Sequence, residues 1–202
     1  MTRTLIVMVK LPRPGRVKTR LARDIGSVAA AWWFRHQTNR LLRRLRDPRW
    51  RLVLAVTPDH AGMHSRVWPA DLPRVPQGGG DLGQRMARVM AMSPSGPACV
   101  IGADIPGISR RHVGAAFETL GDHDAVFGPA HDGGYWLIGL KHPRRQPPSL
   151  LRDVRWSTSH ALADSKASLR GLRIAEVATL RDVDTARDLS MTTAGARATS
   201  GA

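Results

Sequence analysis

The chain has 202 residues, 42% of them hydrophobic, which suits one compact domain with a substantial core. The single Cys99 excludes a disulfide framework or a cysteine zinc cluster. No apolar run is long enough to span a bilayer or form a signal peptide, so we expect a soluble cytoplasmic protein with no membrane partner. Lysine and arginine number 31 against 16 aspartates and glutamates, a formal net charge of +15 that favours anionic partners.

This charge does not by itself predict nucleic-acid binding. Most of the arginines are scattered over predicted helices, and no aromatic residues alternate with them to stack bases. Solvated helix faces are therefore the favoured interpretation. One predicted helix still carries a basic patch that could dock an acidic partner: Arg35, Arg40, Arg43, Arg44 and Arg46.

The first half of the chain alternates predicted strands and helices. TLIVMVK predicts a buried strand, LPRPGRVKTR a loop, and LARDIGSVAAAWWFRHQTNRLLRRL a single helix that ends before Asp47. RLVLAVT and the short PRVPQ predict two more strands. After the glycine run GGGDLG, the helix DLGQRMARVMAM is expected to begin with Asp81 as its N-cap.

The second half continues with the strand ACVIGAD, a helix from Ser109 to about Leu120 and the strand DAVFGPA. FGPAHDGGYWLIGL leaves no room for a helix between two strand-like runs, so these strands should not be a parallel pair. A helix from about Ser157, a strand in LRIAEVATL and a short helix in DVDTARDL follow. The fold class is thus α/β, a single-domain three-layer α/β/α fold with a mainly parallel mixed sheet over 1–190, and 191–202 is expected to be a disordered tail.

Asp104 is the most informative candidate residue. A carboxylate at the carboxyl end of a buried strand lies where open α/β sheets bind ligands, and it can hold Mg²⁺ against phosphate oxygens. It could instead cap the next helix, but Ser109 is the better N-cap. Asp184 is the expected second ligand, whereas Asp182 could cap the terminal turn and Asp132 could orient an acceptor.

The loop VKLPRPGRVKTRLA between the first strand and the first helix can present phosphates to helix amides. Gly15 lets backbone approach a ligand, and the loop carries the basic residues Lys10, Arg13, Arg16, Lys18 and Arg20. It matches neither GxGxxG nor a P-loop, so a solvated basic loop is an equally good interpretation of the spacing.

Three further features leave alternatives open. The glycines of QGGGDLGQRM are costly to order, so either a ligand or a tight surface turn should account for them, and Arg85 after them could reach the crevice. His60 and His64 have helical metal-pair spacing but no third ligand, which favours surface histidines. Trp156 in RWSTSH could border an acceptor pocket.

Together, VKLPRPGRVKTRLA, QGGGDLGQRM, VIGADIPGI, FGPAHDGGYWLIGL, WSTSHAL and DVDTARDL resemble the ordered motifs of a family of bacterial transferases, over about residues 4–190. That family is similar to the 2-phospho-lactate guanylyltransferases and, more distantly, to the nucleotide-diphospho-sugar transferases with the GT-A fold. The resemblance implies this fold, a Mg²⁺ or Mn²⁺ cofactor, and a nucleoside triphosphate or sugar nucleotide with a small-molecule acceptor as substrates. A homodimer is left open.

The resemblance also implies roles for individual residues. Phosphates would be bound by Lys10, Gly15, Lys18 and Arg20. Gly78, Gly79 and Gly80 would lie near the base, Asp104 and Asp184 would hold the metal, and Asp132, Gly133 and Gly134 would face the acceptor. One departure is that related first loops are more glycine-rich, whereas Gly15 here is flanked by prolines and arginines.

Nucleotidyl transfer is the leading hypothesis from these residues. An acceptor phosphate would attack the α-phosphorus in line and pyrophosphate would leave, with Lys18, Arg20, Asp104 and Asp132 as the catalytic set. Glycosyl transfer with Asp132 as base is the alternative, and a basic binding protein without catalysis is a third hypothesis.

Overall fold

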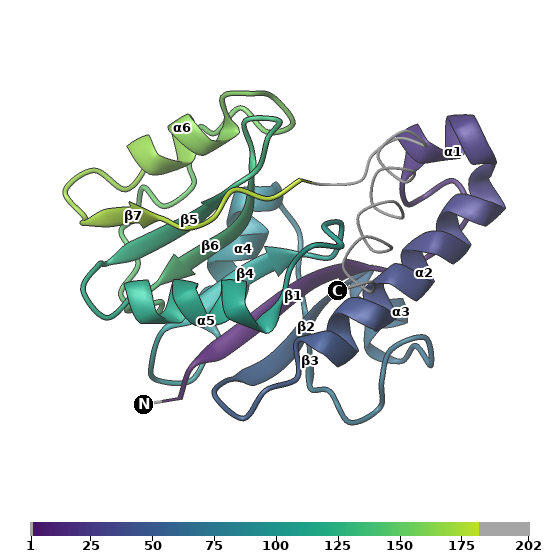
Figure 1. The fold of residues 1–202 in the computed structure, drawn as a ribbon, viewed down its shortest axis with the longest axis horizontal. Helices are drawn as coiled ribbons and strands as arrows, with labels where there is room; N and C mark the ends of the chain where they lie inside the picture. The colour runs from purple at the N-terminus through teal and green to yellow at the C-terminus, as the bar shows by residue number, and fades with distance from the viewer. Residues whose placement is uncertain (1, 182–202) are drawn as a thin grey trace, which may run out of the picture.

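A computed structural model describes residues 2–181 (Figure 1). Its elements are β1 Thr4–Lys10, α1 Thr19–Ile25, α2 Ser27–Arg44, β2 Arg51–Thr57, α3 Asp59–Met63, β3 Arg74–Pro76, α4 Leu82–Ala91, β4 Ala98–Gly102, α5 Arg110–Thr119, β5 Ala125–Pro129, β6 Tyr135–Leu140, α6 Ala161–Ala167 and β7 Ile174–Glu176. The seven strands form one sheet in the order β3-β2-β1-β4-β6-β5-β7. Because β6 is antiparallel to both neighbours while the remaining described pairs are parallel, the predicted mixed, mainly parallel sheet is confirmed.

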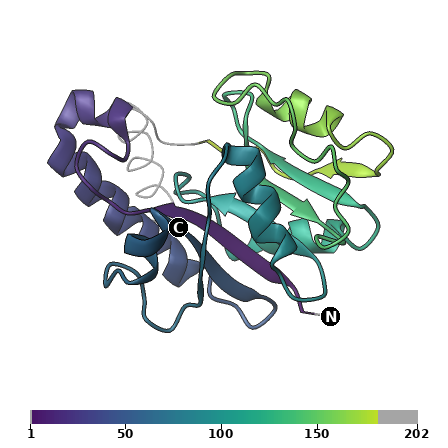
Figure 2. The same ribbon diagram turned by 180° about the vertical axis from the view of Figure 1, so that it is seen from behind.

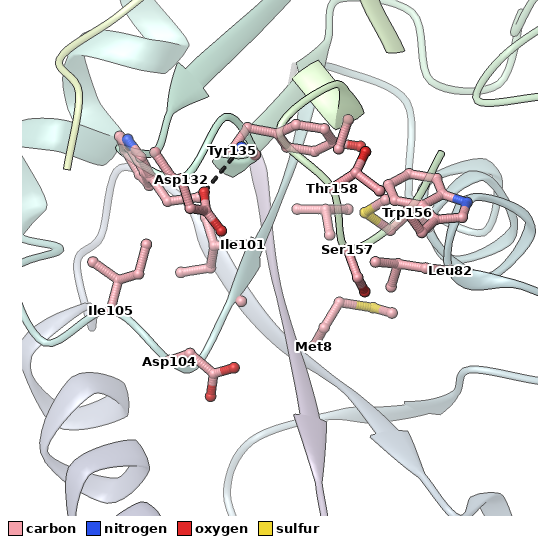
Figure 3. Close-up of a pocket in the computed structure, with 17 residues that line it drawn as sticks. Met8, Leu82, Ile101, Asp104, Ile105, Asp132, Tyr135, Trp156, Ser157 and Thr158 are labelled. Atoms are coloured by element: carbon pink, nitrogen blue, oxygen red, sulfur yellow. Dashed lines mark hydrogen bonds between the residues drawn. The ribbon is translucent and has the colours of Figure 1, made fainter. Parts of the chain in front are cut away.

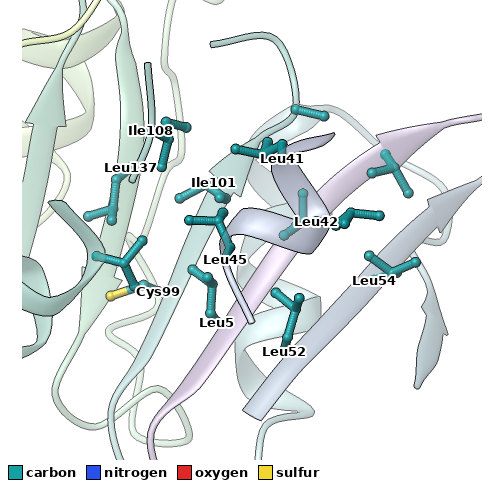
Figure 4. Packing of buried hydrophobic residues seen from close by; sticks show 14 of the residues in the cluster. Leu5, Leu41, Leu42, Leu45, Leu52, Leu54, Cys99, Ile101, Ile108 and Leu137 are labelled. Carbon is teal, nitrogen blue, oxygen red and sulfur yellow. The ribbon is translucent and has the colours of Figure 1, made fainter. Parts of the chain in front are cut away.

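Helices cover both faces of this sheet. Along β1, the side chains of Leu5, Val7 and Val9 join the hydrophobic cluster under α2 and α5, whereas Ile6 joins the cluster under α4 and α6. This alternation is what a strand buried on both faces requires. Figure 4 shows the first cluster, and Figure 2 shows α4 on the opposite face. The predicted three-layer α/β/α architecture is confirmed.

Helix boundaries differ from the prediction at two places. The single helix expected over 21–45 is divided into α1 and α2 at Gly26, whose φ of 86° is a conformation that L side chains rarely adopt. The helix expected from about Ser157 begins at Ala161, because Ser157 has a φ of 61° and belongs to a loop. The segment DVDTARDL, including Asp182 and Asp184, and the tail 191–202 lie outside the described residues.

Both predicted helix caps are found. Asp81 accepts a hydrogen bond from the Gln84 backbone N–H at 2.8 Å, and its own N–H donates to Gln84 Oε1 at 3.0 Å. Ser109 is the N-cap of α5. Within residues 2–181, no helix combines the length and the apolar character that crossing a bilayer requires.

Gln77 ties the sheet to the glycine run that follows it. Its side chain is 3% exposed, and Nε2 donates to the carbonyl oxygens of Val9 at 3.2 Å and Ala55 at 2.8 Å. The Gln77 backbone N–H also donates to the Val56 carbonyl at 3.1 Å. The backbone entering Gly78 is therefore fixed against the ends of β1 and β2.

Replacing Gln77 with leucine should lower the free energy of unfolding by about 1–3 kcal/mol, because two buried carbonyl oxygens lose a donor. Urea denaturation measures this change. The matched control is Gln37→Leu, since Gln37 Nε2 is buried without a hydrogen-bond partner among the described residues and its removal should cost little. Equal losses in the two variants would contradict the role given to Gln77.

Candidate active site

The candidate site lies beyond the carboxyl ends of β1 and β4. The chain runs from β1 outward to β2 and β3, then returns to place β4 on the other side of β1. At such a switch point, the two loops leaving neighbouring strands diverge and open a crevice. Met8 pairs with Gly102, so the loop after Lys10 and the residues around Asp104 enter the same crevice.

Lys18 and Asp104 meet in this crevice. Lys18 Nζ lies 3.6 Å from Asp104 Oδ1, and the two side chains are 4% and 54% exposed. Lys18 is the N-cap of α1 and has a left-handed backbone with φ of 46°, while its carbonyl accepts from the Ala22 N–H. The structure thus brings together the predicted phosphate-binding lysine and the predicted metal-binding carboxylate.

A cavity of about 240 Å³ opens beside Asp104 (Figure 3). Most of its wall is apolar and comes from Met8, Leu82, Met86, Ile101, Tyr135 and Trp156. Its charged lining residues are Asp104 and Asp132, and no lysine, arginine or histidine is among the described residues that line it. In Figure 3, Leu82 and Trp156 lie on the side away from the two carboxylates. The cavity therefore combines an apolar interior with an acidic edge.

The turn between β5 and β6 places Asp132 at this edge. Asp132 Oδ1 accepts from the Gly134 N–H at 2.9 Å, which orients the carboxylate. Gly133 has a φ of 85°, and its carbonyl accepts from the Leu162 N–H at 3.0 Å. A Cβ at Gly133 would lie 2.3 Å from the Ser159 carbonyl oxygen, so only glycine lets the turn approach the loop before α6 so closely.

The loop before α6 forms the far wall of the cavity. The Arg155 backbone N–H and guanidinium donate to the Asp164 carboxylate at 2.8 to 3.0 Å, and these hydrogen bonds hold the pKa of Asp164 well below its usual range. Trp156 packs over the start of α4, where a Cβ at Gly83 would lie 2.9 Å from the indole. The Arg155 contact therefore fixes the loop that carries Trp156 into the cavity.

Tyr135 forms part of the inner wall. Its hydroxyl lies 3.2 Å from Ser165 Oγ, and its ring lies 6.4 Å from that of Trp156 in an edge-on arrangement. Burial raises the pKa of the Tyr135 hydroxyl, so this group stays neutral at physiological pH. Tyr135 is therefore suited to packing and hydrogen bonding rather than to proton abstraction.

A polar cleft adjoins the cavity. It has a volume of about 450 Å³ and is lined by Arg20, Asp132, Ser157, Thr158 and Ser159. Three of these residues, Asp132, Ser157 and Thr158, also line the apolar cavity, so the two spaces share one wall. The predicted residues Arg20 and Asp132 thus face a common space.

The glycine run is anchored away from the cavity. The Gly78 N–H donates to both carboxylate oxygens of Asp59 at 3.2 Å, and Arg88 Nη1 donates to the carbonyl oxygens of Gln77 and Gly79. A separate groove of about 800 Å³ is lined by Gly79 and Gly80. Neither the glycine run nor Arg85 is among the described residues that line the cavity.

Of the remaining predicted residues, Lys10 is the exposed last residue of β1, Gly15 is exposed in the loop that follows, and Gly134 lines the cavity. His60 and His64 have ring centroids 5.0 Å apart. Within residues 2–181, no group of three or more His, Cys, Asp or Glu side chains is placed to hold a metal ion. The predicted partner of Asp104, Asp184, lies outside the described residues.

Sequence reasoning missed Met8, Leu82, Tyr135, Ser157 and Thr158, which all line the cavity. Two signals were available. Met8 stands near the carboxyl end of a strand predicted to be buried, which is a ligand-facing position in α/β sheets. The hydroxyl-rich run STS directly follows Trp156, which had already been linked to an acceptor pocket.

Substituting Gly133 with alanine should destabilise the protein by about 1–3 kcal/mol, because the new Cβ meets the Ser159 backbone in a strained conformation. Thermal or urea unfolding measures the loss. Gly134→Ala is the matched control, since the nearest atom to its Cβ is Asp132 Oδ1 at 3.1 Å. A larger loss at Gly134 than at Gly133 would show that the turn is not clamped as described.

The Arg155 amide should remain protected from hydrogen exchange as the pH falls from neutral to about 4. The Arg155 hydrogen bonds hold the folded pKa of Asp164 below the ordinary aspartate value of 3.8, so the stabilisation from this contact is present above that value and is lost as the pH falls through the lowered pKa. Exchange is measured by NMR after correction for the intrinsic rate. Asp164→Asn should remove much of the protection at every pH, whereas Asp153→Asn in the same segment should retain it.

Solved structures match this fold. A candidate nucleotide-diphospho-sugar transferase from Desulfovibrio desulfuricans G20 is 30% identical, with a TM-score of 0.86 over 95% of this chain and 87% of that one. CMP:2-keto-3-deoxy-manno-octonic acid synthetase, solved with CTP, is 12% identical, with a TM-score of 0.59 over 98% and 99% of the two chains. Rv0371c from Mycobacterium tuberculosis H37Rv, solved with manganese, is 12% identical, with a TM-score of 0.55 over 95% and 97%.

The last two likenesses bear on the fold alone, and together with the first they confirm the predicted nucleotide-diphospho-sugar transferase architecture. No curated protein matches the chain. The predicted similarity to 2-phospho-lactate guanylyltransferases stays a prediction. Residues 41–158 match the family model described as an uncharacterized protein conserved in bacteria (DUF2064), and the chain belongs to this family.

Proposed function

We propose that this protein is a metal-dependent transferase that moves a nucleotidyl group from a nucleoside triphosphate to a phosphorylated small molecule and releases pyrophosphate. The observation that carries the proposal is the 3.6 Å approach of Lys18 to Asp104 at the carboxyl edge of the sheet. This contact supports the proposal because Lys18 would serve as a phosphate-binding cation and Asp104 as a metal-binding carboxylate, beside a cavity and a cleft that can hold a second substrate.

Asp104 suits Mg²⁺ or Mn²⁺ because its half-exposed carboxylate offers the oxygen ligands that hard cations prefer. Asp184 is the proposed second protein ligand, with phosphate oxygens and water completing the shell. A bound cation would withdraw charge from the reacting phosphate. The manganese in the structure of Rv0371c supports a divalent cation in this fold.

The basic loop would bind the triphosphate. Lys18 and Arg20 are proposed to neutralise negative charge that develops on pyrophosphate, and Lys10 and Gly15 to hold the outer phosphates. An oxygen of the acceptor phosphate forms the new bond to the α-phosphorus. The bond from that phosphorus to its leaving bridging oxygen breaks, and pyrophosphate keeps the electron pair. The acceptor is already ionised, so no general base is needed.

Other predicted residues would orient the substrates. Asp132, Gly133 and Gly134 belong to the turn beside the cavity and the cleft, and we assign them to the acceptor side. The run Gly78 to Gly80 and Arg85 would lie near the base, which requires the nucleoside to extend along the edge of the sheet toward the groove at Gly79. The solved complex of the octonic acid synthetase with CTP supports triphosphate binding on this fold.

Glycosyl transfer from a sugar nucleotide is a second candidate. It is favoured by the likeness to the Desulfovibrio desulfuricans structure, which is that of a candidate nucleotide-diphospho-sugar transferase. A hydroxyl acceptor would then need a base. The Asp132 carboxylate lines both the cavity and the cleft and is oriented by the Gly134 N–H, so it is the group placed for that role.

Asp104→Asn should reduce the transfer rate by about a hundredfold or more and weaken Mn²⁺ binding, because the amide lacks the carboxylate's charge. Product release with a panel of nucleoside triphosphates and phosphorylated acceptors measures the rate, and electron paramagnetic resonance measures bound Mn²⁺. Asp122→Asn is the control, since Asp122 lies before the amino end of β5, whereas Asp104 follows the carboxyl end of β4.

The products decide between the candidates. Pyrophosphate release identifies nucleotidyl transfer, and release of a nucleoside diphosphate from a sugar nucleotide identifies glycosyl transfer. If neither product forms and Asp104→Asn binds nucleotide with Mg²⁺ as well as the parent protein, both transferase proposals fail. The chain would then act as a basic binding protein.

A further inference from the structure

We propose that the acceptor is a phosphate ester with an uncharged, apolar body, in which the phosphate occupies the polar cleft and the body fills the cavity beside Asp104. That this ligand is the acceptor rests on the proposed function. The predicted binding preference rests on two adjoining spaces, of which one is mainly apolar and the other is polar and contains Arg20.

The cavity is built for an apolar group. Its volume of about 240 Å³ exceeds the roughly 150 Å³ that holds a benzene ring in an apolar protein cavity. Leu82 is among its lining residues and is 40% exposed, although large apolar side chains gain by burial. A ligand in the cavity would cover Leu82 together with the neighbouring Met8 and Trp156.

Charge excludes an anionic group from the same space. The charged residues of the lining are the carboxylates of Asp104 and Asp132, no lysine, arginine or histidine is among the described lining residues, and Lys18, which lies 3.6 Å from Asp104, is itself paired with that carboxylate. Desolvating an unpaired anion is costly, and nearby carboxylates add repulsion. A second phosphate or a carboxylate on the acceptor body would therefore weaken binding.

The adjoining cleft is more polar and contains a cation. Asp132 lines it as well, but Arg20 contributes a guanidinium, which is suited to phosphate, and Ser157 and Ser159 are hydroxyl-bearing lining residues. Ser157 and Thr158 line both spaces, so the two spaces adjoin. A short linker could therefore join a phosphate in the cleft to a ring in the cavity. This continuity selects one amphiphilic molecule rather than two separate ligands.

The test compares benzyl phosphate with glycerol 3-phosphate by calorimetry, without nucleotide or metal. Both carry one phosphate ester, but only the first has an apolar body. Benzyl phosphate should bind roughly tenfold or more tightly, because burying the ring adds affinity. Leu82→Trp should abolish this advantage by filling the mouth of the cavity, whereas Arg20→Gln should weaken both ligands alike.

Met92→Trp is the matched control, because Met92 is also an exposed apolar residue but caps the far end of α4, and this variant should keep the preference. Equal binding of the two probes, or an unchanged preference in Leu82→Trp, would overturn the proposal. The comparison in the parent protein does not depend on how the variants fold. Product release is a separate assay. If no transfer product formed but benzyl phosphate still bound more tightly, the transferase proposal would fail and the binding preference would stand.

Discussion

The pairing of β4 with β1 determines where Asp104 lies relative to the loop that carries Lys18. Ile101 and Val100 point to opposite faces of β4 and join different hydrophobic clusters, so a slip of one residue would exchange a core face for the other. The two clusters therefore fix the register, and the register fixes Asp104 just beyond the last paired residue, Gly102. The position of the carboxylate is a consequence of core packing rather than of local loop preference.

This placement gives the crevice two electrostatic sides. The loop after β1 brings an almost fully buried Lys18 side chain to Asp104, whereas the turn and loop on the other side contribute Asp132 and hydroxyl groups. The buried Lys18 side chain has lost most of its hydration and favours an anionic partner, whereas the half-exposed Asp104 carboxylate stays accessible to a second cation. Under the proposed function, a metal ion would pair with Asp104 and Lys18 would pair with an incoming phosphate. The Lys18–Asp104 contact would thus be replaced by two new ionic contacts.

The sequence predicts what short-range patterns encode. Buried strands such as β1 and β4 are visible as apolar runs, and Asp81 and Ser109 are recognisable caps because their spacing to the next helix is local. The break at Gly26 is hidden, since the apolar periodicity continues through it. The antiparallel β6 was expected, but its insertion between β4 and β5 is a long-range property.

The candidate site also has a part that the sequence predicts and a part that it does not. Asp104 follows from its place after a strand, while the cavity wall is assembled from distant segments carrying Met8, Leu82, Tyr135 and Trp156. Nothing in the spacing of these four residues indicates that they meet. Their encounter depends on sheet order and on the Gly133 contact with the loop before α6.

The net charge of +15 and the local acidity of the cavity act at different ranges. A strongly positive molecule attracts anions of every kind, and over distances beyond about 8 Å physiological salt screens most of this effect. Long-range charge can therefore raise the encounter rate but cannot distinguish one phosphate ester from another. Discrimination requires a contact that favours one ligand and disfavours its competitors. Under the proposed function, the apolar wall that ends at Leu82 and the carboxylates of Asp104 and Asp132 would provide both, so the uncharged part of the acceptor would be the part that the site selects.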